Sequence, residues 1–224
     1  MTRLTDSCRV EWKLLRLHGS EVGRILGLGV PAGIQHMIFA VANLFIQVGI
    51  NSFDSTVVSG NSAAVNVDNV IYNVMAAFYT ACSTFMGQNW GAGKKDRMMK
   101  SYYISLGYSF VIAAVLGVAF LLCGEPFLYI FTNDADVVAA GMERMRIMCF
   151  SYCVSAFMDC TIAACRGLGR SFVPTVIVIM GSCVFRVIWV YTIFAMFHTL
   201  TSLYLLYIFS WALTAIGQMV YFFR

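Results

Sequence analysis

Six long apolar runs dominate the sequence, and each is long enough for a helix to cross a lipid bilayer. We place them at residues 27–51, 58–87, 101–123, 143–165, 173–195 and 202–223. A spanning helix takes about 20 mostly apolar residues. The runs are too long for strands and lack the alternation of a membrane barrel, so the backbone must satisfy its own hydrogen bonds as helices. The sequence therefore predicts an all-α integral membrane protein, with a six-helix bundle over residues 27–224.

Composition agrees, because 60% of the residues are hydrophobic, 12% are charged and the mean hydropathy is +0.77. A water-soluble domain does not need that excess. Residues 1–26 differ, since they mix charged side chains with Trp12 and several leucines and have no apolar run before Ile25. They do not form a cleavable signal peptide. We expect either an amphipathic segment on the membrane surface or an ordinary polar lead-in.

Basic residues lie on one side of the predicted topology. They occur in the basic N-terminal segment, in alternate loops and at the C-terminal end, at Lys94, Lys95, Arg97, Lys100, Arg166, Arg170 and Arg224. The opposite loops carry the acidic residues Asp54, Glu125, Asp134 and Asp136. Basic loops stay in the cytoplasm, so both termini are predicted to be cytoplasmic, in a cell membrane. The net charge of +4 comes from these helix ends and forms no basic face, so nucleic acid is not an expected partner.

Cysteine and histidine usage predicts neither a metal site nor an enzyme. The eight cysteines form no CxxC pair, which favours reduced thiols that pack as small apolar groups. The histidines, His18, His36 and His198, are far apart in the topology, and neither HExxH nor GxSxG occurs. The segment 87–95 superficially resembles a phosphate loop, but five residues separate its glycines and Lys95 stands where Ser or Thr would bind magnesium.

Polar side chains on the first two predicted helices indicate a hydrated surface within the membrane. His36, Asn43 and Gln47 share one face of the first helix at 100° per residue. A second polar face runs along residues 61–80. Such side chains usually face a cavity or a neighbouring helix. For a single Asn, an interhelical hydrogen bond of about 0.6 to 2 kcal/mol is the simpler account. Two adjacent polar faces favour a cavity, and its candidate lining residues are Gln35, His36, Asn43, Gln47, Asn69, Tyr72 and Asn73.

Three charged residues lie well inside the predicted spans, away from their ends: Asp68, Asp159 and Arg186. Asp68 and Asp159 are candidates for binding a coupling ion, and Arg186 is a candidate structural charge. Asp68 enters from the outer side and can come level with Arg186 in mid-membrane, whereas Asp159 lies closer to the inner end of its helix. A structural ion pair between Asp68 and Arg186 would account for both. The alternative is that Asp68 itself binds an ion or a cationic compound.

Five short segments resemble the multidrug and toxic compound extrusion (MATE) family. Gly87-Gln-Asn-Trp-Gly-Ala-Gly93 followed by Arg97 resembles the loop after the second helix of a MATE lobe. Residues 28–33, 50–53, 131–134 and 166–169 with Pro174 resemble segments of the C-terminal lobe, in the family's order. The loop residues that carry this resemblance are Gly87, Gln88, Gly91, Ala92, Arg97, Arg166, Gly167, Gly169 and Pro174.

The resemblance implies a fold of two six-helix lobes around a central cleft, of which this chain is similar to the C-terminal one. It implies antiport, in which Na⁺ or H⁺ is exchanged for bulky cationic or amphipathic drugs, with no cofactor besides the coupling ion. The expected partners are the N-terminal six-helix lobe or a second copy, a small organic cation, and membrane lipid. The two polar faces would then line the cleft against the other lobe.

Some residues depart from the family pattern. Asp54 stands where the family more often has Gly, the first helix has no carboxylate, and Asp159 lies about one turn closer to the cytoplasm than expected. The coupling ion therefore stays undetermined. A flippase for lipid-linked sugars is the alternative, but it should have a strongly basic cavity, and Arg186 is the only clear basic group at mid-depth. A purely structural role would not require two polar faces.

Overall fold

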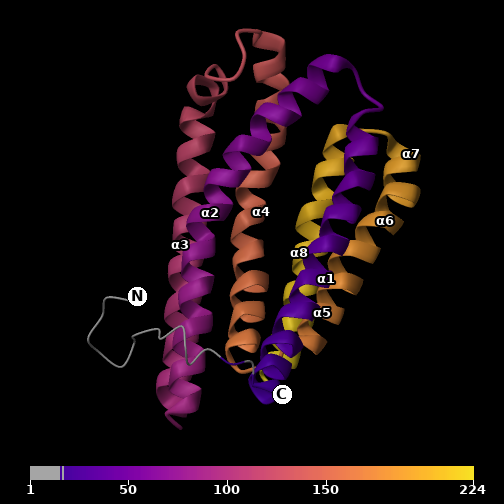
Figure 1. Ribbon diagram of the computed structural model, residues 1–224. Coiled ribbons are helices and arrows are strands. Elements are labelled where there is room, and N and C mark those ends of the chain that lie inside the picture. The colour runs from indigo at the N-terminus through magenta and orange to yellow at the C-terminus, as the bar shows by residue number, and fades with distance from the viewer. Residues whose placement is uncertain (1–15, 17) are drawn as a thin grey trace.

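The computed structural model describes Arg16 and residues 18–224, which are almost entirely helical (Figure 1). No strand occurs in this part of the chain, so the all-α prediction is confirmed. The elements are α1 (Gly19–Ile50), α2 (Ser55–Gly91), α3 (Lys95–Leu128), α4 (Ala135–Gly167), α5 (Phe172–Val178), η2 (Ile179–Val184), α6 (Phe185–Trp189), η3 (Val190–Phe194), α7 (Ala195–Phe197) and α8 (Leu200–Phe222).

Helices α2 and α4 begin before the predicted apolar runs, and polar residues cap their first turns. Asp54 accepts a hydrogen bond from the Val57 amide at 2.9 Å at the start of α2, and Asp134 does the same for Asp136 at 2.9 Å at the start of α4. Helix α1 begins at Gly19 and not at about residue 27. The lead-in was predicted for residues 1–26, and of these residues 1–15 and 17 lie outside the described part of the chain.

Five helical stretches are long and apolar enough to cross a membrane: α1, α3, α4, residues 172–197 and α8. Helix α2 is the longest, with 37 residues, but it is not among them. Its interior asparagines and Asp68 lower its hydropathy. The six long helical segments thus match the six predicted spans, and α2 is the one whose polar face needs protein or water beside it.

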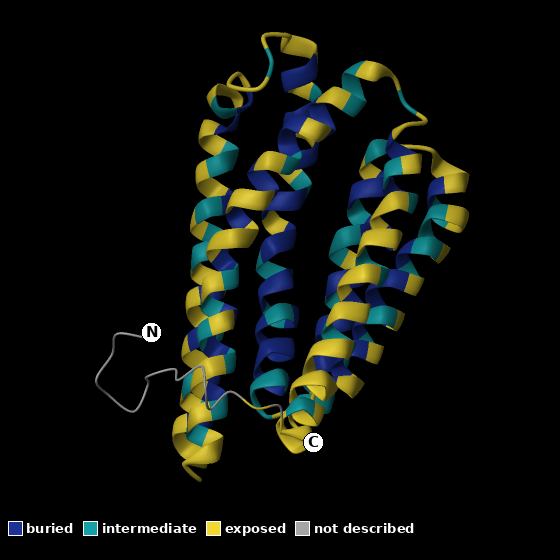
Figure 2. Ribbon diagram, in the orientation of Figure 1, coloured by how far each residue is buried: buried dark blue, intermediate teal, exposed yellow. Residues whose placement is uncertain are grey.

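The helices form two groups that run side by side (Figure 1). Helices α2, α3 and α4 pack together, and α1 packs with the segment 172–197 and α8. Contacts between α4 and α8 join the groups. Helix α4 is the most enclosed of the five apolar spans, as its largely buried surface shows (Figure 2).

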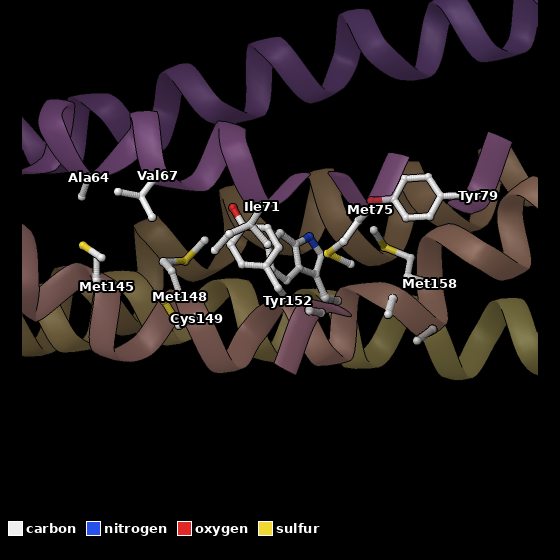
Figure 3. Close-up of a cluster of buried hydrophobic side chains, with 14 of the residues drawn as sticks. Ala64, Val67, Ile71, Met75, Tyr79, Met145, Met148, Cys149, Tyr152 and Met158 are labelled. Atoms are coloured by element: carbon white, nitrogen blue, oxygen red, sulfur yellow. The ribbon is translucent and has the colours of Figure 1, made fainter. Parts of the chain in front are cut away.

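Close backbone approach explains how α2 and α4 pack. A Cβ atom at Gly60 would lie 2.6 Å from the carbonyl oxygen of Val137 and 2.8 Å from the amide nitrogen of Gly141. Small residues at such crossings let helix backbones approach closely in membranes. The core then fills with long side chains, where Ile71 and Met75 of α2 face Met148 and Tyr152 of α4 (Figure 3).

The fifth span departs from regular α-helix. Two π-helical turns, η2 and η3, flank the short α6, which carries Arg186. π-Helical turns are uncommon and often accompany functional sites. The seven cysteines in the described residues are all free, and five are buried, consistent with the predicted packing role.

Candidate functional site

A cavity of about 610 Å³ lies between the two groups of helices. Residues of α1, α2, α4, α6 and α8 line it, so both groups contribute. Its volume lies within the range that holds a drug-sized molecule. Aromatic side chains provide an apolar surface at Phe39, Tyr72, Tyr79, Tyr207 and Trp211. The polar residues that line it include Gln35, His36, Asn43, Thr80, Ser83, Ser155, Asp159, Arg166 and Arg186.

Four of the predicted lining residues meet in this cavity: Gln35, His36, Asn43 and Tyr72. Gln47 lines a second, smaller cavity of about 270 Å³, which Asn43 also borders. Asn69 and Asn73 line neither of these cavities and are exposed on α2. The polar face of α1 was expected to face a separate lobe. His36 and Asn43 of this face line the cavity and are also exposed, and a cleft against a second lobe stays a prediction.

Among the described residues, Asp159 is the only carboxylate that lines the larger cavity. It lies on α4 and accepts a hydrogen bond from the Ser155 hydroxyl at 2.7 Å. Arg166 lines the same cavity but donates to the Gln35 side chain at 3.0 Å. Within the described residues Asp159 has no ion-pair partner. A half-buried carboxylate without a fixed cation can accept a proton or bind a metal cation.

Asp68 does not pair with Arg186, so that prediction is wrong. Its carboxylate accepts hydrogen bonds from Arg144, at 2.6 Å from Nη2 and 3.1 Å from Nε. The third donor of Arg144, Nη1, bonds the Asn61 amide oxygen at 2.7 Å. Arg144 was not predicted to be buried, because the predicted span began at residue 143 and therefore placed Arg144 at the end of the helix. Helix α4 in fact begins at Ala135 and buries Arg144.

Arg186 is also buried, with 1% of its surface exposed, but its surroundings differ. Nη1 donates to the Asn43 side chain at 2.9 Å, and Nε donates to the Ser210 hydroxyl at 3.4 Å. Nη2 has no hydrogen-bond partner in the part of the chain that the structure describes. The guanidinium carbon lies 4.6 Å from the ring centroid of Tyr207, 5.0 Å from that of Phe39 and 5.9 Å from that of Trp211. Aromatic rings and neutral groups therefore surround this cation.

Comparison with known proteins identifies the family. Residues 31–192 match the MatE family. The chain belongs to the MatE family. The probable multidrug resistance protein YpnP of Bacillus subtilis is 32% identical over 132 residues, which cover 59% of this chain and 30% of YpnP. The human multidrug and toxin extrusion protein 1 is 29% identical over 112 residues, which cover 50% of this chain and 20% of that protein.

Solved MATE structures share the fold. An outward-facing MATE transporter of the MOP superfamily superposes with a TM-score of 0.83 at 17% identity, covering 96% of this chain and 48% of that one. The six-helix arrangement is thus that of a MATE lobe. The chain spans about half the length of these solved transporters. Its alignments with the curated relatives cover at most about a third of the length of each relative.

The loops that carry the sequence resemblance lie at one end of the bundle. A Cβ atom at Gly87 would lie 3.0 Å from the carbonyl oxygen of Gly167, so the end of α2 packs against the end of α4. Gly93 and Gly169 have positive φ angles, +70° and +76°, which favour glycine. Pro174 accepts a hydrogen bond from Gln218 at 2.7 Å through its carbonyl oxygen. The remaining motif residues are exposed, at Gln88, Gly91, Ala92 and Arg97. Only Arg166 of this set lines the cavity.

Proposed function

We propose that this chain is one half of a secondary antiporter that exports bulky cationic or amphipathic compounds in exchange for Na⁺ or H⁺. The observation that carries the proposal is the cavity of about 610 Å³, which places aromatic side chains and one carboxylate without an ion-pair partner inside a bundle of membrane-spanning helices. Aromatic faces bind flat amphipathic molecules and attract organic cations.

Asp159 is the group that we propose binds the coupling ion. A carboxylate inside a membrane protein is costly and usually functional. Asp68 is the weaker candidate, because Arg144 already occupies its carboxylate. Exchange follows if the substrate and the ion both require Asp159 or its immediate neighbours, since one must leave before the other binds.

The proposed partner is a second six-helix lobe, which is either a separate N-terminal lobe or a second copy of this chain. Asn69 and Asn73 support it, because both are exposed on α2 at membrane depth, where lipid offers no hydrogen bonds. Assignment to the C-terminal half of the family fold stays a prediction, as do the cytoplasmic termini and the cell membrane location. The MatE match offers no support for the sugar flippase alternative.

The test is export of ethidium from cells without their own efflux pumps. The cells express this chain alone or with the N-terminal six-helix lobe of YpnP, and export is energised by a Na⁺ or a pH gradient. We expect Asp159→Asn to reduce gradient-driven export about 100-fold, as loss of an essential charged group would. Asp136→Asn, which removes an exposed carboxylate at the start of the same helix, should leave export unchanged. Normal export by Asp159→Asn at equal membrane expression would refute the role of Asp159.

A further inference from the structure

We propose that Arg186 binds an anionic group of the transported compound, and specifically a carboxylate on an amphipathic aromatic molecule. This rests on the proposed transport function and narrows its substrate class. A positive charge at Arg186 beside the cavity disfavours a guest that is purely cationic. The compounds that fit best carry both charges, with the cationic part toward Asp159 and the carboxylate at Arg186.

The first reason is the uncompensated charge. Arg186 lies within a span and is 1% exposed, and no carboxylate of the described residues lies within ion-pairing distance of it. A buried cation is strongly unfavourable unless an anion or several dipoles compensate it. The three aromatic rings and two hydrogen bonds around Arg186 compensate it only in part. A ligand anion would complete the compensation.

The second reason is the unused hydrogen-bonding capacity of the guanidinium. Nη2 has no partner, whereas Nη1 uses one of its two hydrogens on Asn43. The Nη1–Nη2 edge of a guanidinium is the fork that a carboxylate accepts in a bidentate pair. Arg186 lines the larger cavity but its Nη2 is buried, so the side chain must turn toward the cavity to present this fork to an anion.

The third reason is the charge balance of the cavity. Its lining includes the guanidinium groups of Arg166 and Arg186 and a single carboxylate, that of Asp159. With His36 neutral, the lining carries one more positive than negative charge. A zwitterionic guest would satisfy Asp159 and Arg186 together, and its aromatic body would lie against Tyr207 and Trp211, which also line the cavity.

Two fluorescent dyes with the same cationic ring system provide the test. Rhodamine 110 carries a free carboxylate, and rhodamine 123 is its methyl ester. The purified chain is placed in lipid nanodiscs, and dye binding is measured by fluorescence anisotropy against empty nanodiscs. We expect the acid to bind about tenfold more tightly than the ester, as one charged hydrogen-bonded contact would provide. Benzoate should displace the acid, and chloride at equal ionic strength should not.

Three variants test whether Arg186 causes the preference. Arg186→Gln should bring the affinities for acid and ester within about twofold, while Arg186→Lys should retain an intermediate preference because it keeps the charge and loses the fork. Arg146→Gln, which removes an exposed arginine of α4, should retain the full preference. If Arg186→Gln does not fold, the preference for the acid over the ester in the wild type and in Arg186→Lys still tests the proposal.

Each outcome has a definite meaning. If the wild-type chain binds the acid and the ester equally tightly, the anion site is overturned. If export of the ester still needs Asp159, the proposed transport function stays intact. If chloride displaces the acid as effectively as benzoate does, an inorganic anion occupies the site at Arg186. That result would also overturn the proposal. A preference that survives in folded Arg186→Gln would do the same. Binding of neither dye would overturn both the anion site and the drug-binding cavity.

Discussion

Arg144 and Arg186 are both buried guanidinium groups, and both lie near the ring of Tyr207, at 5.7 Å and 4.6 Å from its centroid. They differ in what compensates their charge. Arg144 is held by a carboxylate and a carboxamide from α2, so all three of its nitrogens are used. Arg186 has a carboxamide, a hydroxyl and aromatic rings, and one of its nitrogens is unused.

The difference separates a structural charge from a candidate binding charge. Burial alone does not distinguish the two arginines, since 4% of Arg144 and 1% of Arg186 are exposed. The Arg144–Asp68 pair is complete within the protein and fixes α2 against α4. Arg186 lacks a matching anion and borders the larger cavity, which is the arrangement that a charged ligand would complete.

The largest effect should follow from breaking the Arg144–Asp68 pair. Arg144→Met and Asp68→Asn should each lower the free energy of unfolding by about 3 to 5 kcal/mol, because each leaves or creates an unpaired buried group. The double variant should recover more than half of that loss, since no lone charge remains. Unfolding in mixed detergent micelles, followed by circular dichroism, measures these values.

Arg146→Met is the matched control, because Arg146 is an exposed arginine on the same helix, and its removal should change stability by less than about 0.5 kcal/mol. A double variant as unstable as the worse single variant would show that the two charges are not coupled, and the contrast with Arg186 would then be lost.

The sequence predicted the six-helix fold because length and apolarity are properties of each segment alone. It did not predict the Arg144–Asp68 pair, for a physical reason. The first 12 residues of α4 contain Asp136, Glu143, Arg144 and Arg146, so the apolar run begins well inside the helix. Helical periodicity placed Asn43 and Tyr72 on polar faces correctly. It could not show that α2 and α4 would lie across from α1, because that depends on close contacts such as those of Gly60.

An intermediate effect should follow from separating α2 and α4 at Gly60, next to Asn61. In Gly60→Ala the new methyl group would meet backbone atoms of Val137 and Gly141 at 2.6 and 2.8 Å, and α4 cannot move away without disturbing Arg144. We expect a loss of about 1 to 3 kcal/mol in the free energy of unfolding. The same measurement on Gly107→Ala, where nothing lies within 4 Å, should show no loss. Equal stability of the two variants would contradict the tight α2–α4 contact.

The smallest loss of stability is expected on comparing the two asparagines that accept hydrogen bonds from the buried arginines. Asn61 is 3% exposed and accepts hydrogen bonds from Arg144 and, at 3.4 Å, from Tyr204. Asn61→Ala removes the acceptor of two buried donors and should lower the free energy of unfolding by about 1 to 3 kcal/mol. Asn43 is exposed and borders both cavities, so that water can replace its oxygen at Arg186 in Asn43→Ala.

We therefore expect Asn43→Ala to lose less than about 0.5 kcal/mol, similar to a surface substitution. Asn66→Ala is the control for both, because Asn66 is exposed and bonds only the carbonyl oxygens of its own helix. The same unfolding measurement orders the three variants. Equal losses in Asn61→Ala and Asn43→Ala would mean that Arg186 is as closed to water as Arg144. An anion could then not reach Arg186 from the cavity, and its unused nitrogen would need another explanation.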